Sequence, residues 1–174
     1  IDGKSFATLK NAIDAAKADS GCRIVSGGGC DDSKGWFVEP TVIEVSDPMH
    51  TTMKTEYFGP LISIHVYEDS KYSEMLATCD KTAEYALTGA VLSNDRAATI
   101  EAINALRYTA GNFYINDKPT GAVVGQQPFG GSRASGTNDK AGSILNLLRW
   151  TSQRTMKETF VPDTEWRYPF LDEQ

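Results

Sequence analysis

A carboxylate and two small-residue loops are the parts of this 174-residue chain that could bind a small molecule. Glu56 lies in Glu56-Tyr57-Phe58-Gly59-Pro60, directly before an alternating stretch that reads as a strand. A carboxylate accepts hydrogen bonds through two oxygens, so it suits a pair of vicinal hydroxyl groups. The alternative is a surface glutamate that precedes a Gly-Pro turn, and the spacing alone fits both.

The two loops lie later in the chain. Thr120-Gly121-Ala122 could leave backbone N–H groups open to hold a carboxylate, since small residues allow close approach to the backbone. Phe129 is flanked by Pro128 and paired glycines, so it could be presented to a cavity. The alternatives are an ordinary flexible turn and a phenylalanine that anchors its loop on the core.

The cysteines and histidines give weaker indications. Cys22, Cys30 and Cys79 are unevenly spaced and form neither a disulfide framework nor a paired set of metal ligands. A nucleophilic cysteine also needs a base and an open site, and no such neighbourhood is visible around any of the three. With only His50 and His65 in the chain, both read as surface histidines, and we expect no metal site.

Helices and strands are expected to alternate through residues 5–116, which predicts an α/β fold with a parallel sheet. Residues 117–143 are glycine-rich, and an irregular loop of that length is usually functional. The predicted helices cover residues 5–18, 72–80 and 97–107. The predicted strands cover residues 23–26, 36–45 with an interruption at Pro40, 61–67, 88–93, 111–116 and, late in the chain, 147–160.

Composition excludes several classes of protein. The formal net charge is −6 and the pI about 4.9, so a basic face for nucleic acid is not expected. No apolar run approaches the roughly 20 residues that a membrane-spanning helix needs. The chain begins Ile1-Asp2-Gly3 and its first methionine is Met49, so we expect a piece of a longer protein.

Four segments, taken in order, resemble the aldehyde dehydrogenase superfamily. The matches are to its Gly-x-Phe-x-x-Pro-Thr, Glu-x-Phe-Gly-Pro, Gly-x-x-x-x-Asn and Pro-Phe-Gly-Gly-x-x-x-Ser-Gly motifs. They fall at residues 35–41, 56–60, 111–116 and 128–136. Residues 116–140 are similar in more detail to the pyrroline-5-carboxylate dehydrogenase branch, the L-glutamate γ-semialdehyde dehydrogenases of proline breakdown.

The resemblance implies a role for each segment. Glu56 matches the glutamate that holds the nicotinamide ribose of NAD, and Phe58 the phenylalanine beside the nicotinamide. The backbone of Gly121 and Ala122 matches the loop that anchors the carboxylate of a small aldehyde substrate, glutamate semialdehyde. Phe129 matches the aromatic ring that packs on the aliphatic chain of that substrate. We expect Glu56, Gly121 and Phe129 to surround one common cavity.

The departures from the family are equally informative. The family's catalytic cysteine stands in a Gly-Gln-x-Cys setting, attacks the aldehyde to give a thiohemiacetal and then carries a thioester. Neither that cysteine, nor the general-base glutamate, nor the NAD-binding βαβ region has a match here. We therefore expect no catalytic residue in this chain, and no activity from the chain alone.

The resemblance also implies organisation and location. Residues 1–146 are expected to be the C-terminal part of the aldehyde dehydrogenase catalytic domain, and residues 147–174 an oligomerisation strand and tail that make a homo-oligomer. The eukaryotic branch is mitochondrial, so the matrix is expected, with the cytoplasm as the alternative. Two other functions stay open: an inactive module that acts through strand pairing, and a dehydrogenase of another semialdehyde.

Overall fold

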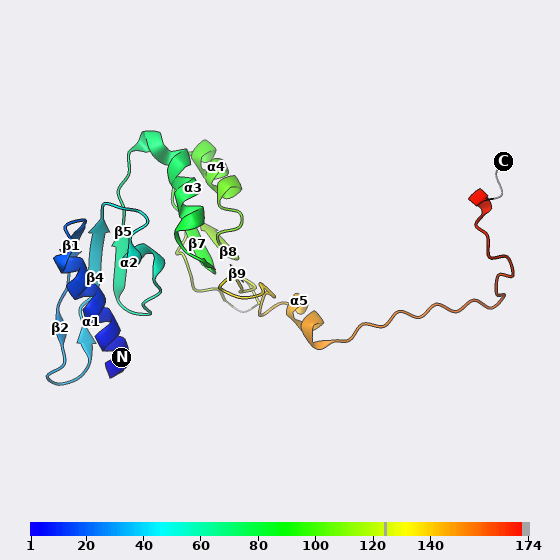
Figure 1. Ribbon diagram of the computed structural model, residues 1–174, viewed down its shortest axis with the longest axis horizontal. Coiled ribbons are helices and arrows are strands. Elements are labelled where there is room, and N and C mark those ends of the chain that lie inside the picture. The colour runs from blue at the N-terminus through cyan, green and yellow to red at the C-terminus, as the bar shows by residue number, and fades with distance from the viewer. Residues whose placement is uncertain (124, 172–174) are drawn as a thin grey trace.

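The chain folds as two packed α/β groups followed by an extended tail, as Figure 1 shows. The computed structural model describes residues 1–123 and 125–171. Val124, which belongs to the motif at residues 116–140, and residues 172–174 of the expected tail lie outside the described residues. The predicted α/β class is confirmed.

The first group is a three-stranded sheet covered by a helix. The strand order is β1 (Cys22–Ser26), β4 (Thr41–Val45), β5 (Leu61–Ile64), in which β4 pairs antiparallel with β1 and parallel with β5. Helix α1 (Gly3–Ala18) packs on this sheet. The sheet is therefore mixed rather than wholly parallel as expected.

Helix α1 forms because its apolar residues recur at helical spacing and its first turn is capped. Phe6, Leu9 and Ile13 are buried along one face, as the predicted helix over residues 5–18 requires. The Asp2 carboxylate accepts the Ser5 N–H at 2.7 Å and so satisfies one of the free donors of the first turn. Ala16 joins Ile43 and Val45 of β4 in the core of this group.

Short elements fill the connections of this sheet. Strands β2 (Cys30–Asp31) and β3 (Phe37–Val38) form an antiparallel pair, and Pro40 separates β3 from β4, as the interruption predicted. The four-residue helix α2 (Thr51–Lys54) was not expected from the sequence.

The second group pairs two helices with two parallel strands. Helices α3 (Tyr72–Thr82) and α4 (Arg96–Ala105) pack together beside β7 (Thr88–Val91) and β8 (Asn112–Ile115). Leu76, Ala102 and Leu106 are buried at its centre. The 3₁₀ turn η1 (Asp69–Lys71) leads into α3. Helix α4 is capped by Asp95, whose carboxylate accepts the N–H groups of Ala97 and Ala98.

The glycine-rich region is mostly irregular, as predicted, but two short pairings organise it. Strand β9 (Ser132–Arg133) pairs antiparallel with β6 (Tyr85–Ala86), and Phe129 forms an isolated bridge with Ala141. The Ser135 hydroxyl accepts the Ala86 N–H at 3.0 Å, which gives this motif serine a structural contact.

Two predicted strands differ from the structure. Strand β5 ends at Ile64 rather than at residue 67. The next residue, His65, makes a hydrogen bond between its Nδ1 atom and the Val45 carbonyl oxygen at 2.9 Å. The predicted strand at residues 147–160 is wrong over its beginning, because α5 (Ile144–Leu147) and the 3₁₀ turn η2 (Leu148–Trp150) are helical there.

The tail beyond Trp150 leaves the rest of the described chain, as the orange and red trace in Figure 1 shows. Residues 151–159 have no regular secondary structure, and the only later element described is the 3₁₀ turn η3 (Pro169–Leu171). A strand that forms by pairing across subunits belongs to an assembly, so the expected oligomerisation role, like the division at residue 146, stays a prediction.

Among the described residues, the structure contains no helix that combines the length and the apolar character needed to cross a membrane.

Candidate functional site

The structure brings Gly121, Ala122 and Phe129 together around one cavity of about 390 Å³. Its walls come from the loop after β8 and from the bridge between Phe129 and Ala141. The full lining is Thr120, Gly121, Ala122, Gln127, Phe129, Ala141 and Gly142. Apart from Gln127, these residues are small or apolar, and they leave room for an aliphatic chain beside open backbone.

The backbone of Phe129 is held in place by hydrogen bonds. Its N–H donates to the Ala141 carbonyl at 2.9 Å, and its own carbonyl accepts the Ala141 N–H at 2.8 Å. The Asn112 amide of β8 donates to the Pro128 carbonyl and accepts the Gly130 N–H. A single polar side chain from a strand therefore fixes both neighbours of Phe129.

The glycines of this region permit a close approach of two backbones. A β-carbon on Gly111 would lie 1.8 Å from the Gly130 carbonyl oxygen, so no other residue fits there without a shift. The Lys140 ammonium donates to the Gly111 and Gly130 carbonyls at 2.5 and 3.2 Å. Lys140 thus joins β8 to the loop that carries Phe129.

The turn at Gly121 offers free donors next to a positive charge. Gly121 has a φ of +92°, a conformation that glycine adopts without strain. Among the described residues, the N–H groups of Gly121 and Ala122 donate no hydrogen bond within the chain. A β-carbon on Gly121 would lie 3.6 Å from the Lys118 Nζ, so an ammonium group lies beside this turn. Such a group attracts a carboxylate.

Asn116 follows the last residue of β8 and precedes this turn. Its side chain accepts the Ser93 N–H at 2.8 Å and donates to the Ser93 carbonyl at 2.9 Å, which ties the end of β8 to the end of β7. Asn116 has a φ of +53°, in the left-handed region that asparagine tolerates better than most residues.

Sequence reasoning did not single out Asn112, Lys118 or Lys140 as residues that shape this cavity. Lys118 was visible only as part of the matched motif at residues 116–140. Asn112 and Lys140 act on backbone carbonyls and N–H groups that lie 10 to 29 residues away, and spacing gives no sign of such contacts.

Glu56 and Phe58 do not line this cavity. They lie on the loop between α2 and β5, and the expectation that Glu56 would share one hollow with Gly121 and Phe129 is therefore wrong for the described chain. The reason is that β5 belongs to the first group, whereas the cavity belongs to the loop after β8.

The Phe58 side chain is nevertheless presented in an unusual way. It is 86% exposed and its φ is +51°, which is costly for a bulky residue. Gly59 behind it lies so close to Leu9 that a β-carbon would lie 2.4 Å from a methyl group of that leucine. Packing of Gly59 against Leu9 of α1 thus fixes the loop. The Phe58 ring points to solvent, and the neighbouring Glu56 is exposed.

None of the three cysteines lines the cavity, and two of them disfavour the thiolate form. Burial raises the pKa of the Cys22 thiol, with a further contribution from Asp19, and burial raises the pKa of Cys79. Both directions work against a nucleophile.

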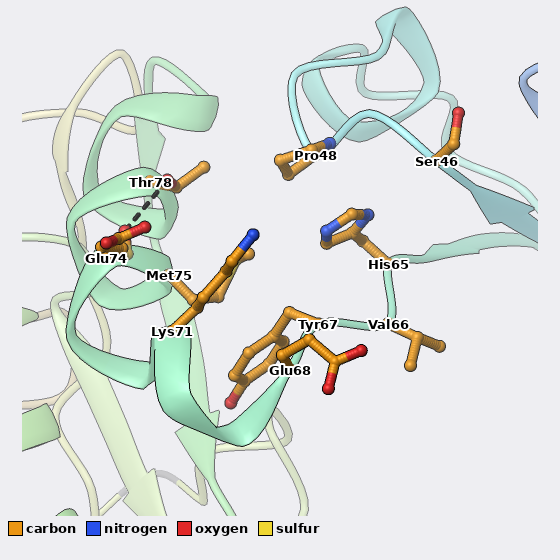
Figure 2. A pocket seen from close by; sticks show the side chains of 10 residues that line it. All are labelled: Ser46, Pro48, His65, Val66, Tyr67, Glu68, Lys71, Glu74, Met75 and Thr78. Carbon is orange, nitrogen blue, oxygen red and sulfur yellow. Dashed lines mark hydrogen bonds between the residues drawn. The ribbon is translucent and has the colours of Figure 1, made fainter.

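A second cavity, of about 410 Å³, lies between the two α/β groups (Figure 2). His65 from the end of β5 and Lys71 at the start of α3 point into it, and Tyr67 and Glu68 lie along its lower edge. None of the predicted site residues belongs to its lining.

Comparison with known proteins gives this geometry its context. The sequence profile described as Aldehyde dehydrogenase family matches residues 1–156. The chain belongs to the aldehyde dehydrogenase family. Its motifs at residues 35–41, 56–60, 111–116 and 128–136 all fall inside the matched range, so the resemblance read from them is confirmed.

Two curated relatives share one enzyme name. The chain is 59% identical over 171 residues to the mitochondrial delta-1-pyrroline-5-carboxylate dehydrogenase of Dictyostelium discoideum, and 53% identical over 171 residues to that of Homo sapiens. In both comparisons 98% of this chain is covered, but only 31% and 30% of the relative. The chain thus spans about a third of the length of these relatives.

Solved structures show the same fold. The delta-pyrroline-5-carboxylate dehydrogenase of Mycobacterium tuberculosis matches with a TM-score of 0.81 at 54% identity, over 98% of this chain and 32% of that one. A structure of the mycobacterial enzyme bound with NAD matches with a TM-score of 0.79. The predicted aldehyde dehydrogenase-like fold is therefore confirmed.

Proposed function

We propose that this chain is part of an NAD-dependent L-glutamate γ-semialdehyde dehydrogenase. In that enzyme it binds the α-carboxylate end of the substrate and the ribose of the cofactor. The observation that carries this proposal is the cavity shared by Gly121, Ala122 and Phe129 in a chain 59% identical to a named pyrroline-5-carboxylate dehydrogenase. The oxidation yields glutamate in proline catabolism.

The substrate part of the proposal follows from the cavity. The free N–H groups of Gly121 and Ala122, with the Lys118 ammonium beside them, suit the α-carboxylate of glutamate semialdehyde. The small side chain of Ala122 leaves room for that group. Phe129 supplies an apolar wall for the methylene groups of the substrate.

The cofactor part rests on the loop before β5. Among the described residues, the Glu56 carboxylate has no hydrogen-bond or ion-pair partner, so both of its oxygens are available to ribose hydroxyl groups. Phe58 is held outward beside it at a positive φ. When bound, NAD accepts the hydride that leaves the substrate. These residues fit the ribose and the edge of the nicotinamide ring.

The reacting sulfur is assigned to another part of the enzyme. Cys22, Cys30 and Cys79 lack the family's Gly-Gln-x-Cys setting, and none of them lines the cavity. We therefore propose that the chain alone is inactive, because covalent catalysis needs the missing nucleophile.

A chimera tests the proposal. The corresponding segment of the Dictyostelium discoideum relative is replaced by this chain, and NADH formation is followed with glutamate semialdehyde. We expect activity from the chimera and none from the chain alone. A soluble, folded chimera that binds neither NAD nor glutamate semialdehyde would contradict the proposal, as would NADH formation by the chain alone.

The proposed compartment rests on the names of the relatives. The Dictyostelium and human proteins are named mitochondrial, so we propose the mitochondrial matrix for this protein. We also propose that the enzyme is a homo-oligomer to which residues 147–174 contribute.

A second candidate function has its own observation. Trp150, Phe160 and Trp166 are each more than 80% exposed in the tail, which suits an inactive module that acts by pairing with another subunit. The chimera separates the two functions, since a pairing module has no need of the cavity. A dehydrogenase of another semialdehyde is separated by the preference of the chimera among semialdehydes.

A further inference from the structure

Lys140 contributes to the substrate cavity although its own side chain does not line it. It directly precedes Ala141 and Gly142, which do line the cavity, and its half-buried ammonium group donates to two backbone carbonyl groups. We propose that Lys140 is a positioning residue that makes the cavity selective for aldehydes with a carboxylate on an aliphatic chain. This inference rests on the proposed function, because it assigns a specificity to the same cavity.

The ammonium group lies where two carbonyl groups from distant parts of the chain converge. It is 2.5 Å from the Gly111 oxygen, just before β8, and 3.2 Å from the Gly130 oxygen, just after Phe129. Two carbonyl oxygens that face one point repel each other, and a cation between them offsets this repulsion. Hydrogen bonds from a charged donor are also stronger than those between neutral groups. Lys140 therefore holds the Phe129 loop against the start of β8.

The position of this contact determines the geometry of the cavity. The loop that carries Gly121 and Ala122 leaves from the other end of β8, so β8 separates the proposed carboxylate donors from the point where the Phe129 loop is held. If the loop moved away from the start of β8, the Phe129 ring would shift relative to the Gly121 turn. An aldehyde that contacts both parts would then bind less tightly, because its contacts depend on their separation.

The backbone of Lys140 holds the segment that pairs with Phe129. Ser143 donates its N–H to the Lys140 carbonyl at 3.1 Å and its hydroxyl to the same oxygen at 2.7 Å. This turn encloses Ala141 and Gly142, and Ala141 exchanges two hydrogen bonds with Phe129. One residue thus contacts the Phe129 loop through its side chain and fixes the paired segment through its backbone.

The conformation of Lys140 gives independent support. Its φ is +56°, in the left-handed region that a lysine rarely adopts and that glycine adopts without strain. Such conformations persist where the surrounding contacts hold them, and they are frequent at ligand-binding sites. The contacts of the ammonium group are the stabilising interactions that offset this strain.

Amide hydrogen exchange of the chain itself tests whether Lys140 holds the loop. Lys140→Met keeps the length of the side chain but removes its charge and its donors. We expect the N–H groups of Phe129 and Ala141 to exchange at least about tenfold faster in this variant, while the Ile13 N–H in α1 keeps its rate. Lys81→Met, the same change at an exposed lysine in the last turn of α3, should leave all three rates unchanged.

Kinetics of the chimera test the effect on specificity. We expect Lys140→Met to raise the KM for glutamate semialdehyde at least about tenfold, and Lys140→Arg, which keeps the charge, to recover part of this loss. The KM for NAD and the kcat/KM for acetaldehyde should stay unchanged, because acetaldehyde has no chain or carboxylate to place in the cavity. Partial unfolding would instead lower kcat for both aldehydes and leave their KM values unchanged.

Three results would overturn the proposal: unchanged exchange at Phe129 and Ala141, an unchanged KM for glutamate semialdehyde, or an equal loss of kcat/KM for both aldehydes. A chimera that binds neither NAD nor glutamate semialdehyde would contradict the proposed function instead. The exchange rates of the chain would still decide whether Lys140 holds the loop.

Discussion

Ala122 sets the space available beside the free backbone donors of the substrate cavity. We expect Ala122→Phe in the chimera to raise the KM for glutamate semialdehyde by about tenfold or more, which corresponds to about 1.4 kcal/mol. The added ring occupies the position proposed for the substrate carboxylate. The KM for NAD should stay unchanged, because Glu56 and Phe58 lie outside this cavity.

The control is the same enlargement one residue further along. Val123 is 53% exposed and does not line the cavity, so Val123→Phe should leave the KM for the semialdehyde near its original value. Equal effects of the two changes would show that the loop, and not the cavity, determines substrate affinity.

Glu56 gives the complementary prediction. Glu56→Gln keeps the size of the side chain but removes its charge, and hydrogen bonds to charged groups contribute about 1.5–3 kcal/mol. We expect the dissociation constant for NAD to rise at least about tenfold in the chimera, measured by quenching of protein fluorescence, with little change in the KM for the semialdehyde. An unchanged affinity for NAD would remove Glu56 from the cofactor site.

At the scale of elements, the cap of α1 makes the stability of the first group depend on pH. The hydrogen bond from the Ser5 N–H holds the pKa of Asp2 below its ordinary value. A carboxyl group whose pKa is lower in the folded state stabilises that state above the unfolded pKa, and this contribution is lost as the pH falls through the folded pKa.

Asp2→Asn tests this dependence. The variant should unfold at a lower urea concentration than the original chain at neutral pH, and the difference should vanish in acid below the folded pKa of Asp2. Circular dichroism during urea titration at a series of pH values measures both midpoints. A difference that persists unchanged into acid would assign the effect to something other than the carboxylate.

Some of the helices could be predicted from local sequence signals, whereas the secondary structure near residue 147 could not. The helical spacing of Phe6, Leu9 and Ile13 and the cap at Asp95 are local signals, so α1 and α4 were predictable. Residues 147–160 read as a strand from their own composition, yet 144–150 are helical. In a short segment with few contacts, the sequence alone does not determine whether a strand or a helix forms.

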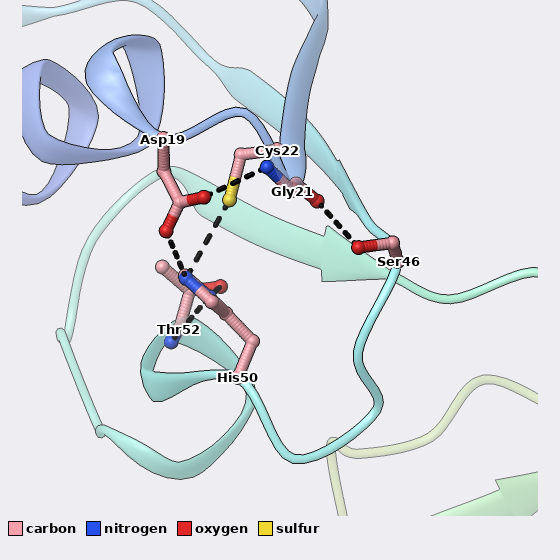
Figure 3. A network of polar contacts seen from close by, with 6 residues as sticks. All are labelled: Asp19, Gly21, Cys22, Ser46, His50 and Thr52. Atoms are coloured by element: carbon pink, nitrogen blue, oxygen red, sulfur yellow. Dashed lines mark hydrogen bonds and ion pairs between the residues drawn. The ribbon is translucent and has the colours of Figure 1, made fainter.

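The site residues also differ in how far the sequence indicated them. Gly121, Ala122 and Phe129 were found through a family resemblance, because composition alone fitted an ordinary loop equally well. The contact between Cys22 and His50 joins residues 28 positions apart, and it depends on how α2 packs beside β1. No local spacing in the sequence indicates that contact, which Figure 3 shows.

At the scale of the whole molecule, the chain exposes several large apolar side chains. Ile62 of β5 is 57% exposed, and Trp150, Phe160 and Trp166 of the tail are 81–88% exposed. Large exposed apolar surfaces mark contacts with other protein segments. A chain that spans about a third of its relatives is expected to show such surfaces.

We therefore predict that the chain self-associates and that the tail drives this association. Sedimentation velocity over a range of concentrations should show oligomers for the full chain and a smaller weight-average mass for a variant that ends at Trp150. If the shortened variant associates as strongly as the full chain, the contacts lie on the α/β groups instead.

The central claim is that this chain binds the tail of the substrate and the cofactor ribose while the reacting sulfur comes from elsewhere. A crystal structure of the chimera with NAD and the product glutamate tests it most directly. We predict the glutamate carboxylate on the N–H groups of Gly121 and Ala122, its methylene groups against Phe129, and a ribose of NAD on Glu56. Glutamate bound away from this cavity, or a ribose without contact to Glu56, would contradict the account.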